Sequence, residues 1–97
     1  MTSELTVVDK PSQSRFVLLR GTEELGEAVY SRNGDAIEFT HTQIDEHKRE
    51  QGMGSTLVRA ALDQVAATPS VVVASCPFVA EFIEENPEYQ RLLKARD

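Results

Sequence analysis

Arg49-Glu50-Gln51-Gly52-Met53-Gly54-Ser55 is the stretch that decides the fold of this 97-residue chain. Its two glycines, one residue apart, let the backbone turn tightly and approach a ligand without an intervening Cβ atom. The residues that follow repeat at helical spacing and form one apolar stripe: Leu57, Val58, Ala61, Leu62 and Val65. A glycine turn that leads into a helix brings backbone N–H groups and the positive end of the helix dipole to one place. The stretch therefore predicts an anion site, and phosphate is the usual anion.

Spacing excludes two common phosphate-binding motifs. A P-loop requires a lysine directly after its second glycine, whereas Ser55 follows Gly54. A dinucleotide-binding fingerprint requires a third glycine at position 57, where this chain has Leu57. That fingerprint should also follow directly on a strand, and here the polar residues 45–51 intervene.

Apolar periodicity predicts the secondary structure on both sides of the glycine turn. Short apolar segments bounded by turn residues predict strands at 5–8, 15–20, 25–31, 36–42 and 71–74. Helical spacing predicts helices over 52–67, from residue 77 onward with Phe78, Val79, Phe82 and Ile83 inward, and over about 88–95. Asn33-Gly34 predicts a type I′ hairpin, because both residues tolerate positive φ. The continuous apolar segment 71–74 favours a buried strand, parallel to 36–42 through a helical crossover.

The motif that remains, Arg/Gln-x-x-Gly-x-Gly/Ala at the start of a helix, resembles the pyrophosphate-binding signature of the GNAT acyltransferases. Arg49, Gly52 and Gly54 occupy its fixed positions. Further matches run in the same order: His41-Thr42-x-Ile44, Cys76-Pro77-Phe78-Val79 and Pro87-Glu88-Tyr89. Over about 26–92 the chain is similar to the small, single-domain GNAT-like N-acetyltransferases. The expected fold is therefore α/β and GNAT-like, with an antiparallel four-strand meander, a helix, a parallel fifth strand and C-terminal helices, all in one domain spanning 1–97.

The resemblance implies that the chain binds acetyl-CoA and passes its acetyl group to an amine, either of a small molecule or of a protein lysine. The residues expected to bind the cofactor are Thr42, Ile44, Lys48, Arg49, Gln51, Gly52, Met53, Gly54, Ser55, Phe78 and Phe82. Lys48 and Arg49 form the local basic cluster that an acidic chain needs to hold an anion, although alone they read as ordinary loop charges. Phe78 and Phe82 are first of all core residues, one of which flanks the pantetheine arm.

Two residues depart from the family pattern. Glu50 stands where a glycine or a small residue is common, which brings a carboxylate near the expected pyrophosphate. Asn86 replaces the histidine often found before the Pro-x-Tyr motif. The first departure is expected to weaken ligand affinity, and the second removes one proton carrier.

Cys76 is the first candidate for chemistry. It directly precedes Pro77, which favours the first position of a helix, so Cys76 is expected at the N-cap, where backbone N–H groups favour a thiolate. In the resembling proteins a cysteine at this place faces the thioester of CoA, as a transient acyl acceptor or only as a neighbour of the acetyl group. The alternative is a small buried apolar residue that closes the end of a strand.

His41 and Tyr89 are the other catalytic candidates. Alternation with Ile37 and Phe39 predicts that His41 lies on the apolar face of its strand. Parallel pairing would bring His41 and Cys76 to the same edge of the sheet, where His41 would act as a general base; the alternative is a core histidine with both nitrogens satisfied. By the resemblance, Tyr89 either protonates the departing CoA thiolate or only packs the C-terminal segment.

Composition limits the remaining classes of function. A net charge of −6 argues against a general nucleic-acid binder, and no histidine spacing suggests a metal site. A single cysteine forms no internal disulfide, and no apolar segment is long enough to cross a membrane or to serve as a signal peptide, so we expect a cytoplasmic setting.

Three functional hypotheses remain open from the sequence. The first is an N-acetyltransferase, whose acceptor side should be open, because the helices that larger family members carry between their first two strands are reduced here to a few residues. The second is a non-catalytic acyl-CoA-binding or sensing module. The third is an α/β domain whose glycine turn binds nothing.

Overall fold

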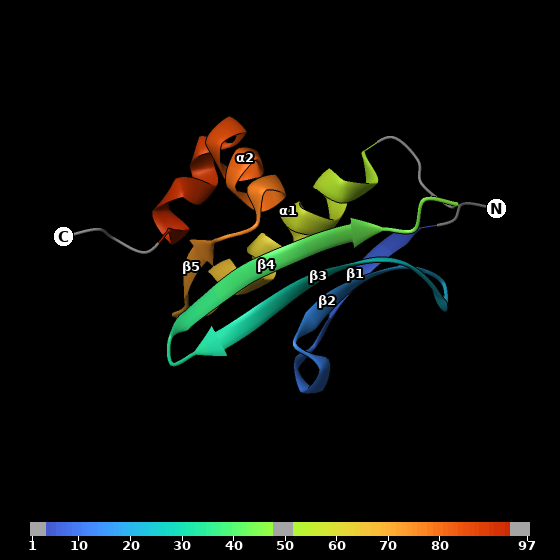
Figure 1. The fold of residues 1–97 in the computed structure, drawn as a ribbon, viewed down its shortest axis with the longest axis horizontal. Helices are drawn as coiled ribbons and strands as arrows, with labels where there is room; N and C mark the ends of the chain where they lie inside the picture. Colours follow the sequence, from blue (N-terminus) through green and yellow to red (C-terminus); the bar gives the residue numbers. More distant parts are fainter. Residues whose placement is uncertain (1–3, 48–51, 94–97) are drawn as a thin grey trace.

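The computed structural model describes residues 4–47 and 52–93, which form a five-stranded sheet with both α-helices packed on one of its faces (Figure 1). The elements in chain order are β1 (Leu5–Lys10), the 3-10 turn η1 (Pro11–Gln13), β2 (Arg15–Arg20), β3 (Glu23–Asn33), β4 (Ala36–Ile44), α1 (Met53–Ala66), β5 (Val71–Ala74), α2 (Pro77–Glu85) and the 3-10 segment η2 (Pro87–Leu92). Spatial order follows chain order, with β1 to β4 antiparallel and β5 parallel to β4. The predicted α/β architecture is confirmed.

The helix α1 makes the crossover between the parallel strands β4 and β5. Its apolar stripe is buried: Met53, Leu57, Val58, Ala61, Leu62 and Val65. The helix starts after Gly52, whose φ of +85° is a left-handed conformation that a Cβ atom would strain. It ends before Pro69, which has no N–H group to continue the helix. The sequence predicted this helix to within a residue at each end.

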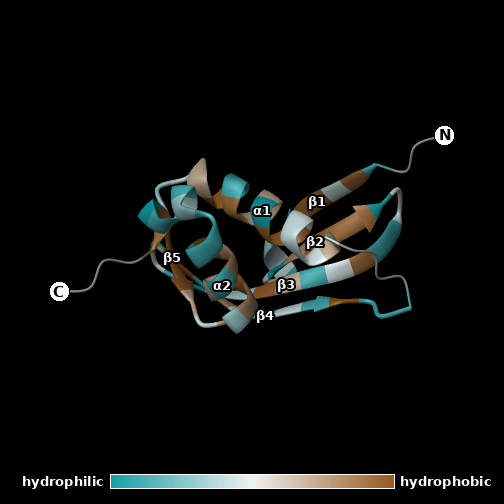
Figure 2. Ribbon diagram, turned by 90° about the horizontal axis from the view of Figure 1, so that it is seen from above, coloured by the Kyte–Doolittle hydropathy of each residue, from teal (hydrophilic) through white to brown (hydrophobic). Residues whose placement is uncertain are grey.

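The core lies between the sheet and the two helices. Three aromatic rings from neighbouring strands, Phe16, Tyr30 and Phe39, lie with centroids 5.4 to 6.2 Å apart. Figure 2 shows the apolar and polar segments that alternate along the strands and around the helices. At about 25 cal/mol per Å² of apolar surface, burial of this layer is the main favourable contribution to stability.

A β-bulge in β4 corrects one prediction about the site. Tyr30 pairs with Phe39, but Val29 pairs with His41, so Thr40 is an extra residue in β4. An extra residue reverses the alternation of side chains beyond it. The prediction that His41 shares the apolar face with Phe39 is therefore wrong: Phe39 is buried, whereas His41 is exposed.

Several boundaries and one turn differ from expectation. The hairpin between β3 and β4 is confirmed, but Asn33 still belongs to β3 and pairs with Ala36. The two central residues are Gly34 and Asp35, of which only Gly34 has a positive φ, at +62°. A type I′ turn needs positive φ at both positions, so that turn type is wrong. Strands β1, β3 and β4 are two residues longer at one or both ends than predicted, and the last segment is the 3-10 helix η2.

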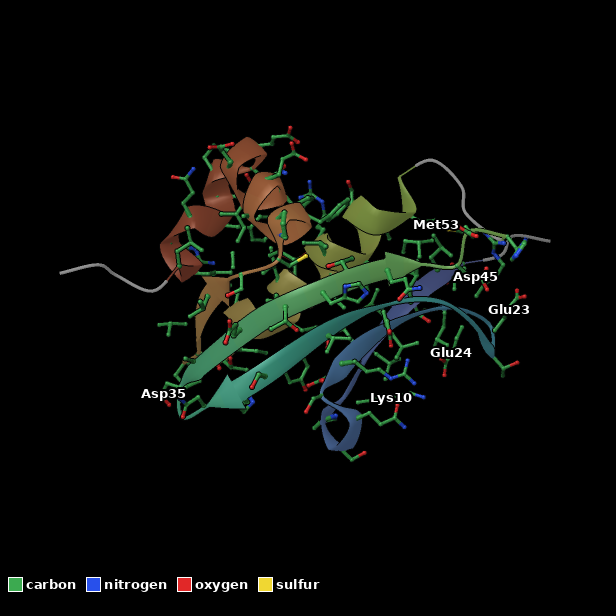
Figure 3. All side chains as sticks on the ribbon, in the orientation of Figure 1. Lys10, Glu23, Glu24, Asp35, Asp45 and Met53 are labelled. Carbon is green, nitrogen blue, oxygen red and sulfur yellow. The ribbon has the colours of Figure 1, made fainter. Side chains whose placement is uncertain are left out.

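The opposite face of the sheet is not covered by either α-helix. Lys10 and Glu24 lie on this side, away from α1 and α2 (Figure 3), and their side chains form an ion pair of 3.6 Å. Between β1 and β2 the chain makes only the short turn η1, closed by Ser14 in a left-handed conformation with φ of +54°.

Candidate active site between β4, α1 and α2

The first turn of α1 presents backbone donors that the helix itself does not use. The first intrahelical hydrogen bond runs from the Thr56 N–H to the Gly52 carbonyl, at 2.9 Å. The N–H groups of Gly54 and Ser55 precede this bond, and no side-chain hydrogen bond from Gly52 caps the helix. Ser55 is exposed and Gly54 half-buried, so these donors lie near the surface. The predicted ligands Lys48, Arg49 and Gln51 lie outside the described residues, as does Glu50.

Gly54 also allows close contact between α1 and α2. A Cβ atom at this position would lie 2.7 Å from Cζ of Phe78, nearer than real Cβ atoms come. The ring of Phe78 is 41% exposed, so the prediction that it points inward is wrong, whereas Val79, Phe82 and Ile83 are buried as predicted. Phe78 therefore lies over the first turn of α1 with part of its ring in contact with solvent.

The strand β5 pairs with only the first part of β4. The register runs from Ala36 opposite Val71 to Phe39 opposite Ala74. One further hydrogen bond joins the Cys76 N–H to the Phe39 carbonyl, at 2.8 Å. From there the chain turns into α2, while β4 continues to Ile44. Within the described residues, the last five residues of β4 thus extend beyond the end of β5.

Cys76 lies at the point where the two strands separate. It is the N-cap of α2, in extended conformation and followed by Pro77, as predicted. Its side chain is only 4% exposed, and its Sγ atom lies 3.4 Å from Oγ1 of Thr42. The thiol is buried, as the interpretation of Cys76 as a small apolar residue predicted. It also contacts the hydroxyl of Thr42, so its surroundings are not purely apolar.

His41 is not brought to Cys76. Its exposed ring places Nε2 3.2 Å from Oε1 of Gln43, the next residue on the same side of the strand. The bulge instead turns Thr42 toward the helices, next to Cys76. A bulge has no reliable signal in a single sequence, because a threonine such as Thr40 is also favoured in a regular strand.

Tyr89 is held on the outer side of α1. Its hydroxyl donates to Oδ1 of Asp63 at 2.7 Å and accepts from Nη1 of Arg59 at 3.4 Å. Burial, followed by the hydrogen bond to Asp63 and the negative charge of that carboxylate, raises the pKa of Tyr89, while Arg59 partly opposes the shift. A phenol bound in this way serves first to fix η2 on α1.

Arg59 joins these residues into one cluster that the sequence analysis missed. Its guanidinium lies over the rings of Phe82 and Tyr89, 5.3 and 5.8 Å from their centroids, and donates to Oδ1 of Asn86 at 3.1 Å. Asn86 also donates to the Phe82 carbonyl at 2.8 Å. The side chain of Asn86 therefore links Arg59 of α1 to the end of α2 through two hydrogen bonds. The helical spacing of Arg59 and Asp63, four residues apart, was the only signal that they share a face.

Three more predicted cofactor residues are mainly core residues. The side chains of Ile44, Met53 and Phe82 are 8%, 2% and 6% exposed. The side chains of Ile44 and Met53 can therefore make little contact with a ligand.

A separate hollow of about 500 Å³ lies between the start of β3 and the end of β4. Its charged side chains are Arg15, Glu24, Glu27, Asp45 and Glu46. Arg15 already pairs with Glu24 at 3.3 Å and with Glu27 at 3.1 Å. The surplus of carboxylates makes this hollow unsuitable for the phosphates of CoA.

The described residues hold neither a metal site nor a membrane-spanning helix. In that part of the chain no three His, Cys, Asp or Glu side chains converge as a metal site would require. The same residues contain no helix long and apolar enough to span a membrane.

The fold and the site together define an α/β domain in which a glycine turn precedes the crossover helix α1, beside the point where the parallel strands β4 and β5 separate. The profile of the GCN5-related N-acetyltransferase family matches residues 15–92, and the chain belongs to that family.

The individual proteins that this chain resembles share less than a third of their residues with it. The chain is 26% identical to protein NATD1 of Danio rerio over 85 residues, which cover 87% of this chain and 77% of the relative. It is 28% identical to NATD1 of Bos taurus, with coverage of 87% and 75%. The solution structure of a GCN5-like protein from Staphylococcus aureus superimposes with a TM-score of 0.69 at 20% identity, covering 99% of this chain and 94% of that one. That likeness supports the fold.

Proposed function

We propose that this protein binds acetyl-CoA and transfers the acetyl group to an amine. One observation carries the proposal: the start of α2 lies against the start of α1 at one residue and holds the thiol two residues earlier. Phe78 packs on Gly54, and Cys76, at the N-cap of α2, contacts Thr42. A ligand with an anionic end and a long, largely apolar arm ending in a thioester matches that order of groups.

Backbone N–H groups at the start of α1 would hold the pyrophosphate, with Lys48, Arg49 and Gln51 nearby in the sequence. The partly exposed ring of Phe78 would contact the pantetheine arm. The backbone of β4 beyond Phe39 offers N–H groups where the oxyanion of the tetrahedral intermediate would form.

Two routes of transfer fit this arrangement. In the covalent route the Cys76 thiolate attacks the thioester carbonyl, a new C–S bond forms, and CoA leaves with the electron pair of the broken bond and takes a proton from water. The amine then attacks the acetyl-cysteine, Cys76 leaves as a thiolate, and the amine loses a proton to solvent. In the direct route the amine attacks the carbonyl of acetyl-CoA itself, the C–S bond breaks, CoA leaves as a thiolate and the amine loses a proton to solvent; Cys76 then only borders the acetyl group. Because His41 lies on the other face, neither route assigns it as base to Cys76.

A non-catalytic acyl-CoA-binding module is the second candidate. Tyr89, predicted to protonate the leaving thiolate, has its hydroxyl committed to Asp63 and Arg59. Because these two hydrogen bonds hold the Tyr89 hydroxyl, Tyr89 is less suited to protonate the leaving thiolate, which favours the binding module over the enzyme.

Cofactor binding is tested by thermal unfolding with CoA and with acetyl-CoA. Both should stabilise the protein, by about 2.7 kcal/mol at one hundred times the dissociation constant. Gly52→Ala should reduce this shift strongly, because it strains the turn before α1. Gly34→Ala is the matched control: it also forces a Cβ atom onto a positive φ with no clash, but in the β3–β4 turn. No shift for the wild type at millimolar ligand would refute the proposed cofactor.

Intact-mass analysis after mixing with acetyl-CoA then separates enzyme from module. A hydroxylamine-sensitive acetyl adduct that is absent in Cys76→Ala indicates the covalent route. CoA release with amines but without an adduct indicates direct transfer. Stable binding with neither result would leave the binding module.

A further inference from the structure

We infer that Thr42 is the positioning residue for Cys76: its hydroxyl donates a hydrogen bond to the thiolate and fixes the direction of Sγ. This inference rests on the proposed function for its catalytic meaning, but the contact itself does not. The two side chains come from different elements, β4 and the N-cap of α2, and their Oγ1 and Sγ atoms lie 3.4 Å apart.

The bulge at Thr40 is what creates this pair. In a regular strand, His41 would share the face of Phe39, and Thr42 would point to the opposite side. The extra residue reverses this pattern, so Thr42 is half-buried beneath the helices while His41 is exposed. The hydroxyl of Thr42, and not the imidazole of His41, therefore lies next to the thiol of Cys76.

The backbone of Cys76 is fixed from both sides. Its N–H donates to the Phe39 carbonyl at 2.8 Å, and its carbonyl accepts the Ala80 N–H at 2.9 Å. With the main chain held in this way, the side-chain torsion and the contact with Thr42 determine where Sγ lies. Cys76 is also 4% exposed, so few water molecules can replace a missing partner.

The two protonation states of the thiol use Thr42 differently. With a neutral thiol, either the Thr42 hydroxyl or the Cys76 thiol can donate the hydrogen bond, and both bonds are weak. With a thiolate, sulfur only accepts, so the threonine hydroxyl must donate, and hydrogen bonds to charged groups are the stronger ones. Thr42 is therefore placed to hold the nucleophilic form of Cys76 by a charge-assisted hydrogen bond.

The test follows the rate of Cys76 alkylation by iodoacetamide at neutral pH in the full chain. Thr42→Val keeps the shape of the side chain but removes the hydroxyl. We expect its alkylation rate to fall roughly tenfold. Thr42→Ser should restore the wild-type rate, because serine returns the hydroxyl without the methyl group. A purely structural effect of the substitution would not be rescued by serine.

Thr6→Val is the matched control, because Thr6 is an exposed threonine on β1, a strand that does not pair with β4. It should leave the alkylation rate unchanged. An unchanged rate in Thr42→Val would overturn the inference, even if CoA still raised the melting temperature. A lowered rate that serine rescues, without any CoA effect, would instead retain the Thr42–Cys76 pair and refute the proposed function.

Discussion

Tyr30 shows how one buried polar group sets the alkaline stability of this protein. Its ring is 4% exposed, and its hydroxyl donates to Oδ1 of Asp9 at 2.7 Å. Burial, then the hydrogen bond to Asp9 and that carboxylate's charge, raise the pKa of Tyr30 to about 12, while Arg32 slightly opposes the shift. The folded protein therefore holds this proton at pH values at which the unfolded chain, with a tyrosine pKa of about 10, has lost it.

The sign of the pH dependence follows from this difference. The contribution of Tyr30 to stability is complete below about pH 10 and is lost as the pH rises toward 12. Tyr30→Phe should cost about 1 to 3 kcal/mol at neutral pH and should make the decline between pH 10 and 12 shallower. Urea unfolding at several pH values measures both effects.

Tyr89→Phe is the comparison variant, because Tyr89 makes an equivalent bond to Asp63 and its pKa is also raised. The double variant should lose more of the alkaline decline than either single one. An unchanged decline in Tyr30→Phe would show that other groups govern alkaline unfolding.

At the scale of elements, the contact between the starts of α1 and α2 connects packing to the candidate site. Because a Cβ atom at Gly54 would lie 2.7 Å from Phe78, we expect Gly54→Ala to destabilise the protein by about 1 to 3 kcal/mol through overpacking. Phe78→Ala removes the obstacle. In the Phe78→Ala background, Gly54→Ala should be neutral or stabilising, since alanine favours a helix by about 1 kcal/mol over glycine.

Chemical denaturation of the four proteins in this double-mutant cycle gives the coupling energy. A coupling near zero would mean that Phe78 moves aside at no cost. CoA binding by the same four proteins then shows whether Gly54 serves the ligand as well: if it does, Gly54→Ala will weaken binding even where it no longer lowers stability.

Element type and order could be predicted from the sequence because they depend on local patterns. The apolar stripe of α1 and the Cys76-Pro77 start of α2 matched the structure. The apolar segment 71–74 forms a strand parallel to β4 as predicted, but the prediction that it is buried is wrong except at Val72, because β5 is an edge strand. The candidate site was harder, because its geometry depends on one extra residue in β4. Thr40 shifts the register against β3, and no local pattern reports how two strands pair. Alternation counted from Phe39 therefore predicted that His41 lies beside the thiol of Cys76, whereas its neighbour Thr42 does.

At the scale of the whole molecule, the described residues form a two-layer structure in which they leave one sheet face uncovered. Both α-helices pack against the other face, and β1 connects to β2 through η1 alone (Figure 1). One face of β4 beyond the bulge thus meets the helices at Thr42, and the other carries the exposed His41. The proposed cofactor side and this uncovered face are therefore separated by the thickness of one strand.

The early end of the β4–β5 pairing also has a consequence for hydrogen exchange. Amide protons of 40–43 that point toward β5 have no partner in that strand, since the register ends at Phe39 and Ala74. In deuterated water they should exchange much faster than those of β2, which is paired on both sides. A pantetheine arm held in the opening would slow exchange at 40–43, whereas a ligand held only by its phosphates would slow it at the start of α1 alone. Peptide-resolved exchange with and without CoA would thereby report how far along the chain the ligand reaches.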